Sequence, residues 1–439
     1  MSRILSAKKT DCFSMSDLDS MNPSKKKVLF HLPVKLKPLY YGTQGRILGI
    51  LKYFNDRRDY ISVDIVAANQ LLKESYIAPR WDAEQTQEAL NFADNVFVYE
   101  GRRNLFDFVY TRSKIFYYQK LLQQQLPMDT DYYSPPGYVR FVQSLATQNC
   151  YDYAWINTVN FASLAKSFKS TSTQTIIDTH DIQSRLRRMM KDVLNFKNLK
   201  FDYDSNFIKE VNSLNNFSVV ISDSNYEFSI LKQHLPNKLY SIPHLVENIA
   251  HESENSSYAD REFRHDLLFV GMANMQNADG MKFFLESIFP YVLKAKPDAQ
   301  LTIAGKICKD IQVEPHLSQN VRLLGYVPDL PELYLQSRVM ICPLRTGAGT
   351  NVKLMEAISY SLPIVATKHC ASALSLQNYF NALITDEPVQ YAEFILQLLT
   401  DFQLAQKLSN EVKATYEQQY SKTAIYSKLD SMFGIGEPS

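Results

Sequence analysis

Short apolar runs alternate with longer amphipathic segments along most of the chain. In the first half, we interpret six apolar runs as strands, at residues 28–32, 61–66, 95–99, 153–157, 175–178 and 219–222. These runs are continuously apolar, which is typical of parallel strands that are covered on both faces. Their alternation with helical segments predicts an α/β fold with a doubly wound parallel sheet.

The same pattern restarts after a polar stretch at residues 246–265, which is rich in Ser and Glu and which we interpret as a linker. The later elements are strands at 267–271, 301–305, 321–324, 339–342 and 364–366, helices at 279–293 and 352–360, and a helical tail through Met432. We therefore predict two Rossmann-like domains, 27–245 and 266–420, that face each other across a cleft. We expect residues 1–26 to be a disordered leader and residues 421–439 to form a helix that crosses back to the first domain.

Composition agrees with this architecture and excludes several classes of protein. A length of 439 residues is typical of two domains. The 47 Lys+Arg and 46 Asp+Glu leave a net charge of +1, which gives no reason to expect a nucleic-acid partner. The five cysteines are scattered, which predicts neither a disulfide framework nor a metal site. No apolar run has the length of a membrane span, so we expect a protein that either stays in the cytoplasm or touches a membrane only from the cytoplasmic side.

The strongest chemical signal lies at residues 342–357, where a predicted strand, a loop of small residues and a helix follow one another. Gly347 and Gly349 permit a close backbone approach, and Thr350 suits a helix N-cap. The free amides of the first helical turn then form a site for a diphosphate. Arg345 and Lys353 would add charge-assisted contacts. From composition alone, an ordinary Gly-rich turn with solvated side chains explains the segment equally well.

Two stretches, 266–306 and 325–367, resemble the donor-binding half of the family 4 retaining glycosyltransferases, which have the GT-B fold. The resemblance implies that Glu356 holds the nucleotide ribose and that the loop at 347–352 meets the phosphates and the sugar. It also implies that Gly45 and Arg46, in the first Gly-rich loop, approach the donor phosphate. The expected donor-binding residues are Gly45, Arg46, Gly271, Gly347, Ala348, Gly349, Thr350, Asn351, Val352 and Glu356, and the expected catalytic residues are His180, Arg345 and Lys353.

The chain departs from the usual family pattern at two positions. Ala348 stands where the first of two glutamates is common, so we expect backbone amides to contact the transferred sugar. Asp279-Gly280 stands where a Lys-Gly pair is common, so we expect Arg345 or Lys353 to replace the missing lysine.

His180 lies at the end of a predicted strand, between Asp178 and Asp181. A single histidine is more often structural than catalytic, but this segment resembles the family motif whose histidine lies near the transferred sugar. The basic start of the next helix is either a solvated face or a contact for an anionic acceptor; its residues are Arg185, Arg187, Arg188 and Lys191.

Basic and aromatic residues interleave between Arg102 and Lys120. This pattern suits a helix at an anionic membrane surface, and it equally describes a helix packed on the sheet with its basic residues, such as Arg103, Arg112 and Lys114, in water. We favour the packed helix.

The resemblance implies transfer of a sugar from a nucleoside diphosphate to an acceptor hydroxyl, with no metal and no cofactor. The acceptor would be a carbohydrate, a lipid-linked group or a protein, in the synthesis of cell-surface polysaccharide or glycoconjugate. Two alternatives stay open. One is a non-catalytic partner subunit of the same fold, and the other is a related enzyme such as a nucleotide-sugar epimerase.

Overall fold

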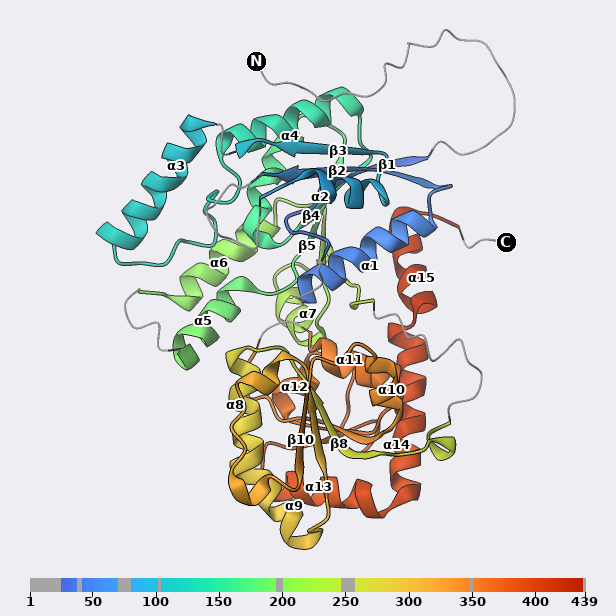
Figure 1. Ribbon diagram of the computed structural model, residues 1–439. Coiled ribbons are helices and arrows are strands. Elements are labelled where there is room, and N and C mark those ends of the chain that lie inside the picture. The colour runs from blue at the N-terminus through green and yellow to red at the C-terminus, as the bar shows by residue number, and fades with distance from the viewer. Residues whose placement is uncertain are drawn as a thin grey trace.

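The computed structural model describes residues 25–37, 42–69, 80–101, 104–194, 200–245, 257–347 and 350–436. Within these residues, two parallel sheets with helices on both faces form an N-terminal and a C-terminal domain, one above the other in Figure 1. This arrangement confirms the predicted fold class of two doubly wound, Rossmann-like domains.

The N-terminal sheet has seven strands in the order β3-β2-β1-β4-β5-β6-β7, all parallel. Its strands are β1 (Lys26–His31), β2 (Ile61–Ala68), β3 (Asn95–Tyr99), β4 (Tyr153–Asn157), β5 (Gln174–Asp178), β6 (Val219–Ser222) and β7 (Leu239–Ser241). The strand order reverses between β1 and β4, which is the place where such sheets bind ligands beyond their carboxyl ends.

The C-terminal sheet repeats this order as β10-β9-β8-β11-β12-β13, again with parallel pairs. Its strands are β8 (His265–Val270), β9 (Leu301–Ala304), β10 (Val321–Gly325), β11 (Ser337–Cys342), β12 (Ile364–Ala366) and β13 (Leu383–Ile384). The apolar pattern predicted every strand of the two sheets except β7 and β13. β7 is the segment Leu-Tyr-Ser, in which no side chain is buried, and β13 has only two residues, so neither forms a continuous apolar run.

The connections between strands are mostly helical. In the N-terminal domain they are α1 (Gly42–Asp56), α2 (Ala83–Leu90), α3 (Leu105–Ile115), η2 (Phe116–Leu121), α4 (Pro136–Asn149), η3 (Val159–Phe168), α5 (Gln183–Leu194), α6 (Tyr203–Leu214) and α7 (Asn225–Lys232). In the C-terminal part they are η5 (Tyr258–Asp260), α8 (Met275–Phe283), η6 (Phe284–Ile288), α9 (Phe289–Ala295), η7 (Lys306–Lys309), η8 (Pro315–Leu317), α10 (Leu330–Leu335), α11 (Val352–Ser359), α12 (Lys368–Ser372), α13 (Pro388–Thr400), α14 (Phe402–Thr415), η9 (Tyr416–Tyr420) and α15 (Lys422–Phe433).

The helix expected at 279–293 is longer and less regular than predicted. It begins at Met275, because Asn274 accepts a hydrogen bond from the backbone N–H of Asn277 and caps the first turn. The helix then passes through the π-helical segment η6 and ends at Ala295.

Side chains of the N-terminal strands alternate between two apolar cores. Phe30 of β1 packs on the face covered by α1 and α2, whereas its neighbour Leu29 packs on the face covered by α4 and η3. Helix α15 completes the first of these cores, although it follows the C-terminal domain in the chain (Figure 1). Asp430 of α15 accepts hydrogen bonds from Tyr53 at 3.0 Å and from Arg57 at 2.8 and 2.9 Å.

The other segments predicted at the domain boundaries lie largely outside the described residues. Residues 1–24 of the expected leader and residues 246–256 of the expected linker belong to this group. The remaining part of the linker contains η5, and β8 begins at its last residue, His265.

Candidate functional site

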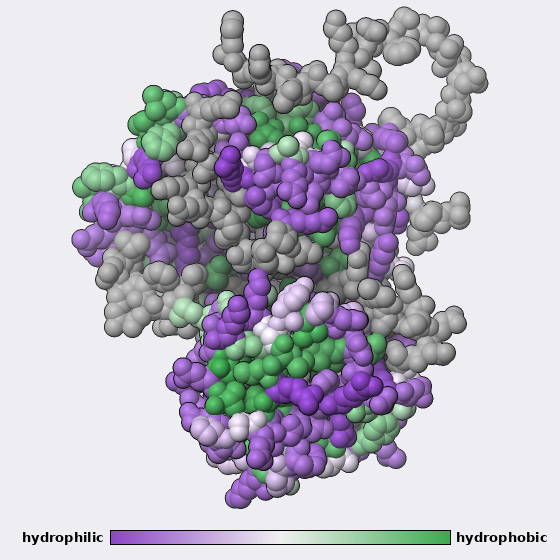
Figure 2. All heavy atoms as spheres, in the orientation of Figure 1, coloured by the Kyte–Doolittle hydropathy of each residue, from purple (hydrophilic) through white to green (hydrophobic). Residues whose placement is uncertain are grey.

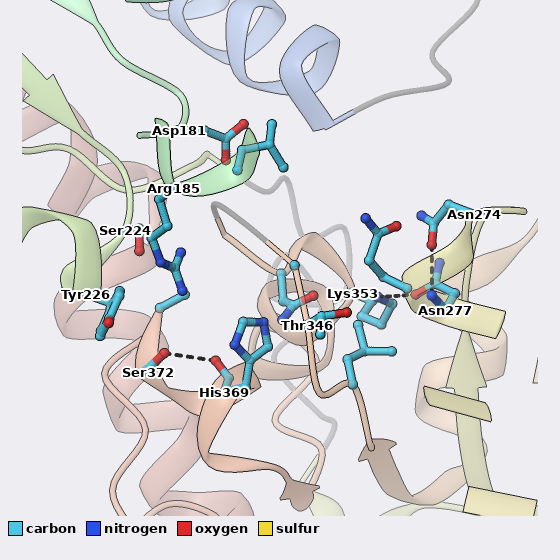
Figure 3. A pocket seen from close by; sticks show the side chains of 16 residues that line it. Asp181, Arg185, Ser224, Tyr226, Asn274, Asn277, Thr346, Lys353, His369 and Ser372 are labelled. Carbon is cyan, nitrogen blue, oxygen red and sulfur yellow. Dashed lines mark hydrogen bonds between the residues drawn. The ribbon is translucent and has the colours of Figure 1, made fainter. Parts of the chain in front are cut away.

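A cavity of about 220 Å³ lies where the carboxyl ends of the two sheets face each other. Its lining comes from both domains, as Figure 3 shows. The N-terminal domain contributes Asp181, Arg185, Leu186, Ser224 and Tyr226, and the C-terminal domain contributes Asn274, Gln276, Asn277, Leu344, Thr346, Gly347, Asn351, Lys353, His369, Ser372 and Ala373. We call these two sets the N-terminal wall and the C-terminal wall.

The C-terminal wall is built on the segment between β11 and α11. Gly347 has a φ of +145°, which a residue with a side chain rarely adopts. Helix α11 begins at Val352, so its first amides point out of the helix end toward the cavity. Lys353 lies on this first turn, and its Nζ donates to Oδ1 of Asn277 at 3.0 Å (Figure 3). This wall therefore offers one cation and a helix N-terminus to an anion.

The N-cap prediction for this helix was wrong. The cap residue is Asn351, and it makes no capping side-chain bond within the described residues. The hydroxyl of Thr350 instead donates across the interface to the carbonyl oxygen of Asp223 at 3.1 Å. The two domains also come close at Gly42, the first residue of α1, because a Cβ there would lie 3.3 Å from Cγ2 of Val352, the first residue of α11. The starts of α1 and α11 therefore meet beside the cavity.

Glu356 lies one turn further along α11 and does not belong to the cavity lining defined above. Its carboxylate accepts a hydrogen bond from the hydroxyl of Tyr334 at 2.7 Å. Tyr334 is in turn stacked on Tyr360, with ring centroids 5.1 Å apart. Burial raises the pKa of Glu356, and the Tyr334 hydrogen bond acts in the opposite direction. The carboxylate is thus held in one orientation and keeps further acceptor positions.

Arg345 has a partner of its own. Its guanidinium binds the carboxylate of Asp279 with N–O distances of 2.7 and 3.2 Å and lies 4.7 Å from the ring centroid of Phe283. Asp279 is the residue at the position where the family resemblance expects a lysine. The two cations expected to take over from that lysine are therefore placed differently, because Lys353 lines the cavity and Arg345 neutralises Asp279.

Behind the N-terminal wall lie buried carboxylates of α6 and α7 that accept hydrogen bonds from the start of α5. Glu227 accepts from the backbone N–H of Ile182 at 2.9 Å, and Glu210 accepts from the backbone N–H of Ser184 at 2.8 Å. Burial, together with the negative charge of Asp223, raises the pKa of Glu227 to about 8. Burial, together with Glu227 and Asp223, raises the pKa of Asp181 well above its usual value. An acid with a raised pKa can hold a proton near neutral pH.

Arg185 is the cation of this wall, and it is already engaged. Its Nη1 lies 3.4 Å from Oε1 of Glu227, and its guanidinium lies 4.5 Å from the ring centroid of Tyr226. Figure 3 shows Arg185 beside Ser224 and Tyr226, on the opposite side of the cavity from Lys353 and Asn277.

Arg46 lies below this wall, inside the domain. Its Nε lies 2.8 and 2.9 Å from the two oxygens of Asp178, and its Nη1 donates to the carbonyl of Ile242 at 3.0 Å. The side chain is 2% exposed, and its Nη2 has no hydrogen-bond partner among the described residues. Gly45 precedes it, and a Cβ at Gly45 would meet the ring of His244 at 3.3 Å. This arrangement fixes the start of α1 to the ends of β5 and β7.

His180 is buried beside the same ion pair. Its Nε2 lies 3.1 Å from Oδ1 of Asn157 and 4.0 Å from Oδ2 of Asp178. Burial lowers the pKa of His180 to about 4, although Asp178 opposes the change, so the ring is neutral at pH 7. Its backbone has a φ of +61°, which turns the chain so that Asp181 reaches the cavity lining.

The predicted site residues thus fall into several groups. Gly347, Asn351 and Lys353 line the cavity, whereas Ala348 and Gly349 lie outside the described residues. The predicted residues that are described but do not belong to this lining are Gly45, Arg46, His180, Gly271, Arg345, Thr350, Val352 and Glu356.

Gly271 has a packing role in the structure. Its backbone N–H donates to Ala304 at 2.9 Å, and its carbonyl lies against Gly305 so closely that a Cβ on Gly305 would meet it at 2.2 Å. Gly305 has a φ of +100°, which also favours glycine.

Sequence reasoning missed most of the polar lining from the C-terminal domain. Asn274 and Asn277 follow β8, and His369 lies on α12 after β12. Their position could have been inferred from the sequence, because each of these three residues follows a predicted strand, at the edge where such sheets bind ligands.

The described residues contain no group of three or more His, Cys, Asp or Glu side chains arranged to hold a metal ion. No helix among them is long and apolar enough to cross a membrane.

Comparison with known proteins connects the C-terminal domain to sugar transfer. Residues 264–401 match the family model of the group 1 glycosyl transferases. An uncharacterized 44.6 kDa protein in the cps region of Klebsiella pneumoniae is 22% identical over 173 residues, which is 37% of this chain. The match spans 45% of that relative, less than half of its length.

Solved structures resemble the chain over nearly its whole length. Anabaena Alr3699/HepE in complex with UDP has a TM-score of 0.59 at 14% identity, covering 93% of this chain and 99% of that one. A mutant of S. aureus TarM, solved with Fondaparinux, alpha-GlcNAc-glycerol and UDP, has a TM-score of 0.58 at 14% identity, covering 93% of this chain and 99% of that one. The chain therefore has the GT-B fold, and its second domain matches the model of the group 1 glycosyl transferases.

Proposed function

We propose that this chain is a glycosyltransferase that moves a sugar from a nucleoside diphosphate to an acceptor hydroxyl. The observation that carries the proposal is the position of Lys353. It lies on the first turn of α11, next to the glycine loop, and lines a cavity between two Rossmann-like domains. A lysine and a helix N-terminus together form a site for a diphosphate.

The rest of the donor fits around this anion site. Glu356, oriented by Tyr334, offers carboxylate oxygens to the ribose hydroxyls. Asn277 holds the Lys353 ammonium, and the loop at Gly347 brings its backbone close to the sugar. Arg46, buried behind the N-terminal wall, would hold the start of α1 in place beside the donor. The UDP complexes of HepE and of the TarM mutant support a nucleotide in proteins of this fold.

The acceptor would enter from the N-terminal wall. Its hydroxyl oxygen forms a bond to the anomeric carbon while the bond from that carbon to the phosphate oxygen breaks. In the retaining reaction that we propose, the acceptor proton passes to the departing phosphate on the same face of the sugar. Asp181 and the neutral His180 would position the acceptor and the sugar, and Lys353 would stabilise the charge on the leaving diphosphate.

A panel of nucleotide sugars tests the proposal. The purified chain is incubated with UDP-, GDP- and other nucleotide sugars, with and without EDTA, and nucleotide release and thermal stabilisation are measured. We expect one donor to stabilise the protein and to be consumed at the same rate with EDTA. Proton NMR of the product then reports whether the anomeric configuration is retained.

The same panel distinguishes the alternatives. Interconversion of two nucleotide sugars without release of the nucleotide would indicate an epimerase. Absence of both stabilisation and turnover with every donor would favour a non-catalytic partner subunit. We further propose a role in cell-surface polysaccharide synthesis on the cytoplasmic side, and the acceptor found in such assays would test this role. The proposed role is in keeping with the similarity to a protein in a cps region.

A further inference from the structure

Helix α3 and the segment η2 project from the N-terminal domain, at the upper left of Figure 1. The buried residues of α3 are Asp107 and Thr111, both polar. Asp107 caps the start of α4, because its Oδ1 accepts from the backbone N–H of Gly137 at 3.0 Å. The inward face of α3 is therefore polar, which is the inverse of an ordinary surface helix.

The apolar side chains of this segment consequently lie in solvent. Those that are exposed are Leu105, Phe106, Phe108, Val109, Phe116, Tyr117, Leu121 and Leu122. Leu105 is 75% exposed and Phe116 is 58% exposed. Figure 2 shows hydrophobic residues at the edge of the molecule where α3 lies. Together with Arg112 and Lys120, these eight residues form what we call the α3–η2 surface. An apolar surface of this kind marks a contact site.

This finding corrects the interpretation favoured from the sequence, a helix packed on the sheet with its basic residues in water. The helix is attached through polar residues, and Lys114 takes part by pairing with Asp131. Arg102 and Arg103 lie outside the described residues.

The charges of the α3–η2 surface are all positive. Asp107 is the only Asp or Glu between residues 104 and 122, and it is buried. Arg112 and Lys120 are exposed, and the guanidinium of Arg112 lies 5.4 Å from the ring centroid of Phe108. Aromatic and aliphatic side chains beside cations, without exposed carboxylates, match the surface of a membrane that contains anionic phospholipid.

We propose that the α3–η2 surface docks the protein on an anionic phospholipid membrane. Apolar side chains would enter the headgroup region, and Arg112 and Lys120 would contact lipid phosphates. The surface is connected to the candidate site, because the chain that follows η2 is held by α5 and α6. Arg187 of α5 donates to the carbonyl of Leu126, and Asn206 of α6 accepts from the backbone N–H of Met128 at 3.2 Å. Docking would therefore fix the N-terminal wall near the membrane, where a lipid-linked acceptor resides.

Vesicle co-sedimentation with the full chain tests this proposal, and it requires neither donor nor activity. The vesicles consist of phosphatidylcholine alone or of phosphatidylcholine mixed with phosphatidylglycerol, at low and high salt. One variant is Leu105→Ser with Phe116→Ser, and another is Arg112→Glu with Lys120→Glu. The matched control is Phe380→Ser with Val389→Ser, which removes side chains that are 50% and 48% exposed on the C-terminal domain. Circular dichroism verifies that each variant is folded.

We expect the wild type and the control to sediment with the anionic vesicles and to dissociate at high salt. Binding should fall about fivefold for each cation removed, and more on reversal, because each contributes on the order of 1 kcal/mol. The serine variant should lose binding to a similar extent. Equal sedimentation of both variants and the wild type would overturn the proposal, as would failure of the wild type to bind. A dimer in sedimentation velocity that only the serine variant disrupts would assign the surface to a second copy of the chain and would also overturn it.

Discussion

The two walls of the cavity differ in the charged groups that support them. The C-terminal wall consists of a glycine loop and the start of α11, and its cation, Lys353, is held by the neutral amide of Asn277. The N-terminal wall stands on several buried acids, and its cation, Arg185, is committed to Glu227. A helix N-terminus with an available ammonium attracts a phosphate. Buried acids that hold their protons near neutral pH, beside a cation that is already engaged, offer a phosphate no free positive charge.

This difference assigns a direction to the proposed reaction. The diphosphate belongs on the C-terminal wall and the neutral acceptor hydroxyl belongs on the N-terminal wall. Both walls share the same position relative to their sheets, beyond the carboxyl ends of parallel strands. The different roles that we propose for the two walls therefore come from their side chains and not from the fold.

The largest effect should come from removing the ion pair beneath the N-terminal wall. Arg46→Met leaves the carboxylate of Asp178 buried without its partner, so we expect the free energy of unfolding to fall by about 3–5 kcal/mol. Urea denaturation measures this change. Arg57→Met is the matched control, because the Arg57 side chain is 19% exposed, whereas that of Arg46 is 2% exposed. If Arg46→Met lowers the free energy of unfolding no more than Arg57→Met does, the buried ion pair of Arg46 and Asp178 does not stabilise the N-terminal wall as we expect.

On the C-terminal wall, Lys353→Met should lower kcat/KM by roughly 100-fold or more, because it removes the cation that stabilises the leaving diphosphate. Arg345→Met, in the loop that precedes α11, is the matched variant. Since Arg345 is paired with Asp279 at the surface, we expect less than about a fivefold loss for this variant. Steady-state kinetics with the donor found in the panel measures both. Equal losses would show that Arg345 leaves Asp279 to bind the donor.

Glu356→Gln should weaken nucleotide binding about tenfold, because a charged hydrogen bond to a ribose hydroxyl contributes on the order of 1.5 kcal/mol. Isothermal titration with the nucleoside diphosphate measures the effect. The control is the analogue without ribose hydroxyls, for which the wild type and the variant should bind equally. A tenfold loss for this analogue as well would indicate that Glu356 acts on the fold and not on the ribose.

The acids of the N-terminal wall should make stability depend on pH. The pKa of Glu227 is raised from 4.5 to about 8 in the folded protein, so the folded state binds a proton more tightly than the unfolded state. The free energy of unfolding should therefore decrease as the pH rises from about 4.5 to about 8. Glu227→Gln should flatten this dependence and stabilise the protein at pH 8 by about 1 kcal/mol or more. Unfolding curves measured across this range test it, and an unchanged slope would contradict the raised pKa.

Much of the architecture could be predicted from the apolar pattern, because a parallel strand buried on both faces leaves a continuous apolar run. The strands β7 and β13 could not, since β7 has no buried side chain and β13 has only two residues. The loop and helix start that line the cavity at Gly347 and Lys353 could be predicted as well, because glycines and a helix start follow a buried strand there. Their exact polar neighbours could not, since Asn277 and His369 come from other segments of the chain.

The sequence by itself determined that two doubly wound domains exist and that Gly347 and Lys353 belong to one helix start, because these features depend on residues adjacent in the chain. Only the tertiary structure decided which cation faces the cavity. The sequence does not distinguish Arg345 from Lys353 as the cation of the site. In the structure, Asp279 on α8 pairs with Arg345, and Asn277 on the same helix orients Lys353. The tertiary structure also decided that α3 turns its apolar side chains outward, because the contacts that attach it, Asp107 with Gly137 and Lys114 with Asp131, are made to residues distant in the sequence.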